Sequence, residues 1–268
     1  MLTLSEFAAI KTKQQAMWAS GDYAVVGNTM PLVAELLCEA MDVRSGWDVL
    51  DVAAGTGNAS LAAARRGCRV TSTDYVPALL ESGRRRAAAE GWKIKFQEAD
   101  AEDLPFGDET FDAVVSTVGV QYAPNQERAA DEMLRVCKKG RKIGMANWTP
   151  GGFVGQVFKV IGKYVPPAAG VKPASGWGSE FRLHQLFRGA AKIETTRRDF
   201  VLRSHSTERW LEVLGTHYGP MVKAMGSLDE ATRVAASAEL LELADEMNRA
   251  QDGTMVVASE YLEVVITK

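Results

Sequence analysis

The chain has 268 residues, of which 46% are hydrophobic, so it can bury a sizeable core in one large or two modest domains. Its 31 lysines and arginines against 34 aspartates and glutamates leave a net charge of -3, which excludes the basic field that binds a phosphate backbone, and we expect no nucleic-acid partner. It has neither a signal-peptide pattern nor an apolar run long enough to cross a bilayer, so we expect a cytoplasmic protein without stable membrane insertion.

The first part of the chain is helical in pattern, at residues 4–18 and 30–42, and we expect residues 1–44 to form an N-terminal cap or lid. Between residues 45 and 150 strands alternate with helices. The expected strands cover 48–53, 69–74, 93–100, 111–117 and 142–148, and the helices between them cover 59–67, 77–90 and 125–137. This alternation predicts right-handed crossovers and an open parallel sheet covered on both faces, with a ligand at the carboxyl ends of its strands.

The pattern changes after Trp148. An amphipathic helix begins near Phe153, and a loop-like stretch at 165–180 and a strand at 192–204 follow. Two helices are expected across 206–250, before a closing strand at 255–267. Residues 151–268 would supply lid helices over a substrate and two strands of the same sheet. The sequence therefore predicts an α/β fold with a doubly wound, mostly parallel seven-stranded sheet, an antiparallel edge strand and helical lid segments.

A glycine-rich bend at Gly55 to Gly57 follows the first expected strand directly and precedes a helix. Bare backbone N–H groups and the positive end of a helix dipole can bind a pyrophosphate or a carboxylate-bearing cofactor. A dinucleotide fingerprint needs a third glycine where Ser60 stands, and no G-K-[ST] of a P-loop follows. Asp74 closes the next strand, where a carboxylate accepts hydrogen bonds from ribose hydroxyls, although a helix N-cap before Pro77 is the competing interpretation.

Four segments occur in order between residues 45 and 150: VLDVAAGTGNAS, TSTD, EADAEDLPFGDETFDAVVS and EMLRVCKKGRKIGMANW. Together they resemble the class I S-adenosylmethionine-dependent methyltransferases. The branch that they resemble most contains the ubiquinone and menaquinone C-methyltransferases, methyltransferase type 11. The resemblance implies a Rossmann-like fold, S-adenosyl-L-methionine as the cofactor and S-adenosyl-L-homocysteine as the product.

The resemblance also implies a role for each matching residue. Asp51 and the backbone around Ala53, Gly55 and Gly57 would hold the methionine part, Asp74 the ribose, Tyr75 the adenine face, Asp100, Ala101 and Glu102 the adenine rim, and the Thr117 carbonyl the methionine ammonium, with Trp18 in a lid over the cofactor. A sulfonium cation beside a zwitterion suits carboxylates at successive strand ends, although strand-to-loop junctions attract aspartate in any case. Ala53 replaces the first glycine of many members, which is tolerable if its φ is negative.

The methyl acceptor is less defined by the sequence. The stretch STVGVQYAPN lacks the N-P-P-[YF] motif for amide or base nitrogens, so we expect a small, partly apolar acceptor methylated at oxygen or carbon. The three cysteines lie far apart and no further carboxylate cluster is visible, so we expect no metal. A base is needed only if the acceptor must lose a proton. The candidates are Tyr122 and His217, which we favour, and His184, His205, Tyr164 and Tyr218.

Aromatic side chains outside the core are the expected source of acceptor specificity. Trp18 and Tyr23 are lid candidates, and the segment 153–180 can close over an apolar acceptor. Two other functions stay open at this point. A nicotinamide-dependent oxidoreductase would bind its cofactor at the same bend, and a catalytically silent cofactor-binding module would act through a partner. The sequence also leaves the oligomeric state open.

Overall fold

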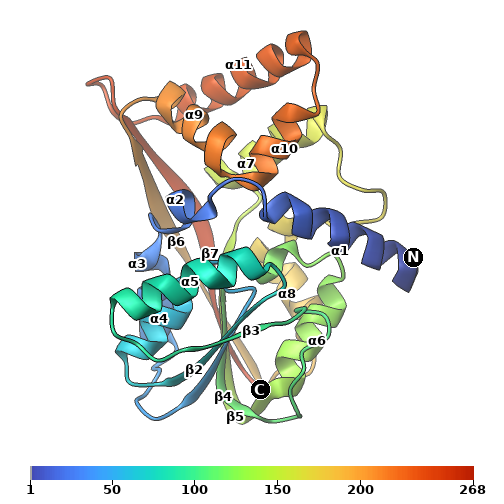
Figure 1. The fold of residues 1–268 in the computed structure, drawn as a ribbon, viewed down its shortest axis with the longest axis vertical. Coiled ribbons are helices and arrows are strands. Elements are labelled where there is room, and N and C mark those ends of the chain that lie inside the picture. Colours follow the sequence, from blue (N-terminus) through green and yellow to red (C-terminus); the bar gives the residue numbers. More distant parts are fainter. Residues whose placement is uncertain (1) are drawn as a thin grey trace.

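A seven-stranded sheet forms the centre of the computed structural model, which describes residues 2–268 (Figure 1). Its strands are β1 (Asp48–Val52), β2 (Arg69–Asp74), β3 (Lys95–Glu98), β4 (Phe111–Thr117), β5 (Cys137–Trp148), β6 (Lys192–Ser204) and β7 (Met255–Thr267). Their order is β3-β2-β1-β4-β5-β7-β6. The first five strands pair in parallel, and β7 is antiparallel to both of its neighbours. The predicted α/β fold class is confirmed.

Burial on both faces explains why the central strands are continuous apolar runs. On one face Leu50 of β1 and Val114 of β4 pack against Met133 of α6 (Gln126–Val136). On the other face Val49 and its neighbours pack against Leu37 of α3 (Pro31–Ala40) and the alanines of α4 (Asn58–Arg65). The crossover between β2 and β3 is α5 (Pro77–Ala89). Because the crossovers run parallel strands in one direction, all their carboxyl ends open at one edge of the sheet.

Two late strands extend past the rest of the sheet as a twisted ribbon. β5 pairs with β7 only from Tyr261 onward, whereas β6 pairs with β7 along its whole length. The protruding half of the ribbon carries Met255 and Val257, which pack against Phe153 of α7 (Phe153–Tyr164) and Trp210 of α9 (Thr207–His217). The helices α10 (Gly219–Gly226) and α11 (Glu230–Met247) complete this cluster. The ribbon therefore lifts a helical cap above the carboxyl ends of the parallel strands.

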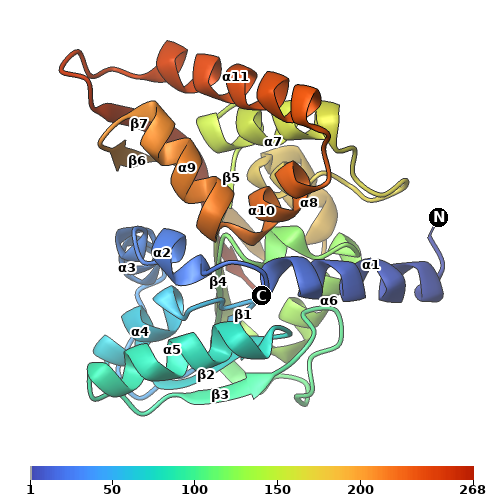
Figure 2. The same cartoon turned by 45° about the horizontal axis from the view of Figure 1, so that its top comes forward.

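The N-terminal helices lie between this cap and the sheet (Figure 2). They are α1 (Leu4–Trp18) and the short α2 (Tyr23–Gly27). Thr3 and Glu6 form a capping box that begins α1. None of the side chains of α1 is buried, so the helix rests on the pocket below it without a packed core of its own. No helix within residues 2–268 combines the length and apolar character needed to span a membrane.

The elements differ from the sequence expectations in several places. Strand β5 begins at Cys137 instead of 142, and β3 is shorter than predicted. The expected loop at 165–180 contains a 3-10 helix at Ala174–Gly178, and the unpredicted α8 (Glu180–Leu186) follows it. Trp177 in that turn is fully buried, which orders a stretch that its glycines and prolines mark as a loop. The predicted helix pair across 206–250 is three helices, since Pro220 starts a new helix just after α9 ends.

Candidate functional site

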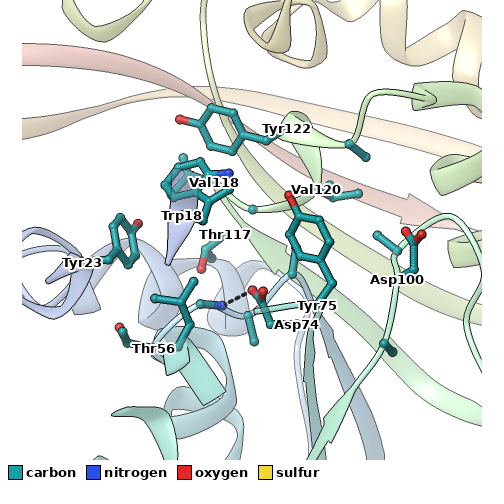
Figure 3. A pocket seen from close by; sticks show the side chains of 18 of the residues that line it. Trp18, Tyr23, Thr56, Asp74, Tyr75, Asp100, Thr117, Val118, Val120 and Tyr122 are labelled. Carbon is teal, nitrogen blue, oxygen red and sulfur yellow. Dashed lines mark hydrogen bonds between the residues drawn. The ribbon is translucent and has the colours of Figure 1, made fainter. Parts of the chain in front are cut away.

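A pocket with an empty volume of about 810 Å³ opens at the carboxyl ends of the parallel strands (Figure 3). It receives residues from the ends of β1, β2 and β4 and from α1 and α2 above them. Its lining includes these residues from the sequence prediction: Trp18, Ala53, Gly55, Asp74, Tyr75, Asp100, Ala101, Glu102, Thr117 and Tyr122. Asp74 and Tyr75 lie together toward one end of the pocket, and Trp18 and Tyr122 lie toward the other (Figure 3).

The glycine bend after β1 forms part of the floor of this pocket. Gly55 and Gly57 have φ values of 56° and 82°, a conformation in which glycine carries no steric cost. Ala53 also has a positive φ, 52°, so the condition under which alanine would be tolerated here without strain is not met. The chain after β4 packs closely on this turn, since a Cβ placed on Gly119 would lie only 2.1 Å from the Ala53 carbonyl oxygen. Val118 is held at φ 47° beside it, so backbone strain gathers at the pocket.

Asp74 supports the bend from the neighbouring strand. One carboxylate oxygen accepts a hydrogen bond from the Gly55 N–H at 2.9 Å, and the other accepts from the Val76 N–H at 2.9 Å (Figure 3). Burial raises the pKa of Asp74 to about 6, and the backbone hydrogen bonds oppose that rise. A buried carboxylate at the pocket wall therefore offers strong hydrogen-bond acceptance beside the bare backbone of the bend.

A second acidic group lies beyond Tyr75 at the same end of the pocket, where β3 leads into the next loop. Lys11 of α1 reaches down to it, and its Nζ lies 2.5 Å from Asp100 Oδ2 and 3.1 Å from Glu102 Oε2. Burial raises the pKa of Glu102, although the hydrogen bond from Lys11 opposes this. Gln15, one turn along α1, donates to the Tyr75 carbonyl. Sequence reasoning missed Lys11, because a lone lysine on a helix gives no signal of the acids that it will meet.

Aromatic rings close the other end of the pocket. The indole of Trp18 lies 4.9 Å from the ring of Tyr122, 5.8 Å from Tyr23 and 5.6 Å from Tyr218, measured between centroids. The hydroxyls of Tyr122 and Tyr218 are 3.3 Å apart, so one donates to the other. Burial raises the pKa of both phenols. The rings come from α1, α2, the segment after β4 and the α9–α10 junction, so this wall exists only in the folded chain.

Known proteins are similar to this chain in sequence and in fold. A family model described as a methyltransferase domain matches residues 49–140. The uncharacterized protein Rv1403c of Mycobacterium tuberculosis is 41% identical over 249 residues, 90% of each chain. Demethylmenaquinone methyltransferase of Clavibacter sepedonicus is 31% identical over 192 residues, 66% of this chain and 78% of that one. The chain belongs to the class I S-adenosylmethionine-dependent methyltransferases.

A solved structure of low sequence identity has the same fold as this methyltransferase. The crystal structure of the YcgJ protein from Bacillus subtilis superposes with a TM-score of 0.62 and 17% identity, over 88% of this chain and 97% of that chain. On the evidence of the family model and the relatives, the chain is an S-adenosylmethionine-dependent methyltransferase, and its cofactor is S-adenosyl-L-methionine. This sets aside the nicotinamide-dependent oxidoreductase and the catalytically silent module that the sequence left open.

The pocket of the methyltransferase suits that cofactor chemically. A sulfonium cation with a ribose and an amino-acid end needs carboxylates, hydrogen-bond acceptors and bare backbone amides. The wall supplies Asp74, Asp100 and Glu102 against a single lysine, Lys11, and the bend supplies backbone close to Asp74. The cofactor, when bound, provides the electrophilic methyl group. The protein side of the reaction is then binding, orientation and exclusion of water.

Two predicted cofactor residues lie behind the pocket wall instead of on it. Asp51 accepts hydrogen bonds from the Ser60 N–H at 2.8 Å and the Ser60 hydroxyl at 2.7 Å, and Gly57 caps α4. The second oxygen of Asp51, Oδ1, has no hydrogen-bond partner among residues 2–268. Burial raises the pKa of Asp51 to about 7, against the effect of the Ser60 hydrogen bonds. In the structure this carboxyl braces the start of α4, so any contact with the cofactor would be indirect.

Of the histidines and tyrosines that the sequence offered as candidate bases, only Tyr122 lines the pocket. His217 ends α9 and does not line the pocket, and neither do His184 and His205. Tyr164 donates instead to Glu239 of α11 at 3.0 Å. Tyr122 lines the pocket, and its partner Tyr218 is the residue directly after His217. Within residues 2–268 no three metal-ligating side chains come together, and the absence of a metal from the reaction stays a prediction.

Proposed function

We propose that the methyltransferase transfers its methyl group to oxygen or carbon of a small, partly apolar molecule that binds against the aromatic wall of Trp18, Tyr23 and Tyr122. The observation that carries this proposal is the division of the pocket. Its charged side chains gather at the end of Asp74 and Asp100, and aromatic rings gather at the other. Flat apolar rings with phenolic hydroxyls suit an aromatic acceptor that bears oxygen.

A relative supports the same acceptor chemistry. The Clavibacter sepedonicus protein is named demethylmenaquinone methyltransferase, so the acceptor of that relative is a quinone-type molecule. We therefore place hydroxylated aromatic compounds first among the acceptors to test.

The cofactor orientation is part of the proposal. Asp74 would bind the ribose, and Tyr75, Asp100, Ala101 and Glu102 the adenine, with the Thr117 carbonyl and the bend at Gly55 toward the methionine end and Trp18 over the cofactor. Support comes from their common position around one pocket. The Asp74→Ala variant should bind S-adenosylhomocysteine about 10- to 100-fold more weakly, as expected for loss of about 1.5–3 kcal/mol in charge-assisted hydrogen bonds. Calorimetry measures this, and unchanged affinity would remove Asp74 from the site.

Tyr122 is proposed to face the acceptor as a hydrogen-bond donor. Burial raises its pKa, so its phenol stays protonated at neutral pH and is poorly suited to act as a base. His217 would contribute only if α9 moved, since it does not line the pocket. Catalysis would then depend on holding the acceptor in line with the reactive methyl group, a contribution that reaches about 7–11 kcal/mol in favourable systems.

Methyl release from labelled S-adenosylmethionine tests the proposal directly. We expect turnover with members of a panel of phenols and quinols, and little with sugars or nucleosides. Turnover confined to strongly polar acceptors would contradict the aromatic wall as the binding surface. With an active acceptor, Tyr122→Phe should lower kcat/KM about tenfold, the scale of one lost hydrogen bond to a buried oxygen, and His217→Ala should leave it unchanged.

We also propose a division of labour along the chain. Residues 1–44 would act as the cap or lid, 45–150 as the cofactor-binding core, and 151–268 as the acceptor lid and the last two strands. Contacts between α1 and α10 support a joint action of the two outer segments. A cytoplasmic location and the absence of a nucleic-acid partner stay predictions.

A further inference from the structure

We propose that Arg86 of α5 is a positioning residue for the amino-acid end of the cofactor. It would hold the glycine bend from behind and place a positive charge next to the cofactor carboxylate. This inference rests on the proposed function, which puts the methionine end at that bend. Arg86 itself is not among the residues that line the pocket.

The contacts of Arg86 all end on the bend. Its Nη1 lies 2.7 Å from the Thr56 carbonyl oxygen, 3.2 Å from the Thr56 hydroxyl and 2.9 Å from Asn58 Oδ1. Thr56 and Asn58 do line the pocket. One guanidinium group therefore grips two pocket residues from the side opposite to the ligand.

The bend needs such support because of its composition. Thr56 stands between Gly55 and Gly57, and glycine leaves the backbone more conformational freedom than any other residue. A carbonyl held in place fixes the whole planar peptide unit to which it belongs. Holding the Thr56 carbonyl thus fixes the Thr56–Gly57 peptide, whose N–H donates to the Ala54 carbonyl at 2.9 Å. The clamp keeps the cradle in its binding shape before the cofactor arrives.

The seating of α5 brings Arg86 within reach. Gly83 lies one turn earlier on the helix, and a Cβ built there would be 2.9 Å from the Phe96 ring and 3.4 Å from the Thr56 carbonyl group. Glycine at this position therefore lets α5 approach the bend closely. Figure 1 shows α5 running alongside α4, the helix that the bend begins.

The charge of Arg86 is half-buried and has no ion-pair partner in the part of the chain that the structure describes. Among residues 2–268 no carboxylate lies within 4.0 Å of its guanidinium, whereas Arg84 pairs with Glu81 and Arg65 pairs with Glu35 and Glu90. Burial lowers the pKa of Arg86, but a guanidinium remains charged at neutral pH. This cation adds to the positive end of the α4 dipole at the same bend, and together they favour an anionic group there. The carboxylate of the cofactor is the anionic group that the proposed orientation brings to the bend.

Two ligands that differ only at the amino-acid end test this role. S-adenosylhomocysteine carries that end, and 5′-methylthioadenosine has the same nucleoside without it. Calorimetry should show that Arg86→Ala weakens S-adenosylhomocysteine binding by about tenfold or more, with less than a twofold effect on 5′-methylthioadenosine. Arg86→Lys keeps the charge but not the fork of donors, so its affinity for S-adenosylhomocysteine should lie between those of Arg86→Ala and the natural chain.

A matched control and clear alternative results complete the experiment. Arg85 is the exposed neighbour on the same helix, so Arg85→Ala removes the same charge and should leave both affinities unchanged. Equal weakening of both ligands by the Arg86 variants would assign the residue to general stability and overturn the inference, and so would unchanged binding of S-adenosylhomocysteine. If Arg86→Ala does not fold, Arg86→Lys decides between these results. Failure of the natural chain to bind S-adenosylhomocysteine would instead count against the proposed function.

Discussion

The two ends of the pocket are built in different ways. The cofactor end is made by the carboxyl ends of β1, β2 and β4, whose residues are almost all buried on both faces of the sheet. The acceptor end is closed by α1, α2 and the α9–α10 junction. Of these, α1 buries no side chain and is joined to the core by hydrogen bonds from Lys11, Gln14 and Gln15. The sheet edge is fixed by packing, whereas α1 is held by these polar contacts and by the ring contacts of Trp18 at its end.

This difference separates the cofactor end, whose shape must stay constant, from the acceptor end, whose shape can vary. Local opening costs least where few apolar contacts are lost, so α1 is expected to open far more readily than the strands. A cap of this kind admits ligands and can change its acceptor without disturbing the cofactor end. The predictions below test each end of the pocket in turn.

The largest effect is expected at the bend itself. Gly55→Val should abolish binding of S-adenosylhomocysteine, by more than about 100-fold, because a β-branched residue is strained at φ 56° and its Cβ would lie 3.4 Å from the Tyr23 ring. Calorimetry measures the affinity. Gly46→Val is the matched control, since Gly46 has φ 82° but open space around its Cβ, and it should bind normally. Normal binding by Gly55→Val would contradict the bare-backbone cradle.

A pH-dependent effect is expected at Asp51, below the same bend. Burial raises its pKa to about 7, far above roughly 3.9 in an unfolded chain, so the folded protein keeps a proton that the unfolded one has lost. This carboxyl therefore stabilises the fold at low pH, and its contribution is lost as the pH rises through about 7. Asp51→Asn stays neutral and can still accept from Ser60.

Thermal unfolding at two pH values checks this sign. Asp51→Asn should raise Tm at pH 8 by about 4 °C, roughly 1–2 kcal/mol for a chain of this size, and the gain should shrink as the pH falls and disappear below about pH 4. Asp48 on the same strand is the control, because its hydrogen bond with Arg69 lowers its pKa and Asp48→Asn should give no gain. A gain for Asp51→Asn that does not depend on pH would show that the carboxyl is not neutral in the folded protein.

A smaller effect is expected where the cap meets the core. Lys11→Met should speed hydrogen exchange of the α1 amides about two- to fivefold, the range for loss of partly exposed ion pairs, because it removes the pairs with both Asp100 and Glu102. Amides of β1 and β4 should exchange as before. Lys13→Met changes an exposed lysine of the same helix and should have no effect. Unchanged exchange in the Lys11 variant would mean that Gln14 and Gln15 are sufficient to hold α1.

The smallest effect is expected at Ala53. Its φ of 52° carries a left-handed strain of about 1–2 kcal/mol, and glycine would relieve the strain at an entropic cost of about 0.5–1 kcal/mol. Ala53→Gly should therefore raise Tm by about 1–3 °C. Ala54 next to it has no positive φ, so Ala54→Gly should lower Tm. Equal changes in Tm for Ala53→Gly and Ala54→Gly would show that the backbone of Ala53 is not strained.

The same contrast between packed and loosely held parts explains which elements could be predicted from the sequence. Strand and helix periodicity predicted the seven strands, because β1 and β4 are buried runs and the helices between the strands carry apolar stripes. The pattern failed after β5, where Trp177 packs into the core and orders a loop-like stretch, and where Pro220 divides one expected helix of the cap into two. Local signals are strong where an element packs along its whole length and weak where single anchors hold it.

The sequence by itself determined the alternating order of elements, the glycine bend and the acids at the strand ends, because each of these is written in neighbouring residues. Tertiary structure alone decided the positive φ of Ala53, the reach of Lys11 to Asp100, the grip of Arg86 on Thr56 and the aromatic wall around Trp18. These features join residues that are distant along the chain, and their partners are chosen by how the helices settle on the sheet. No local pattern of residues carries that information.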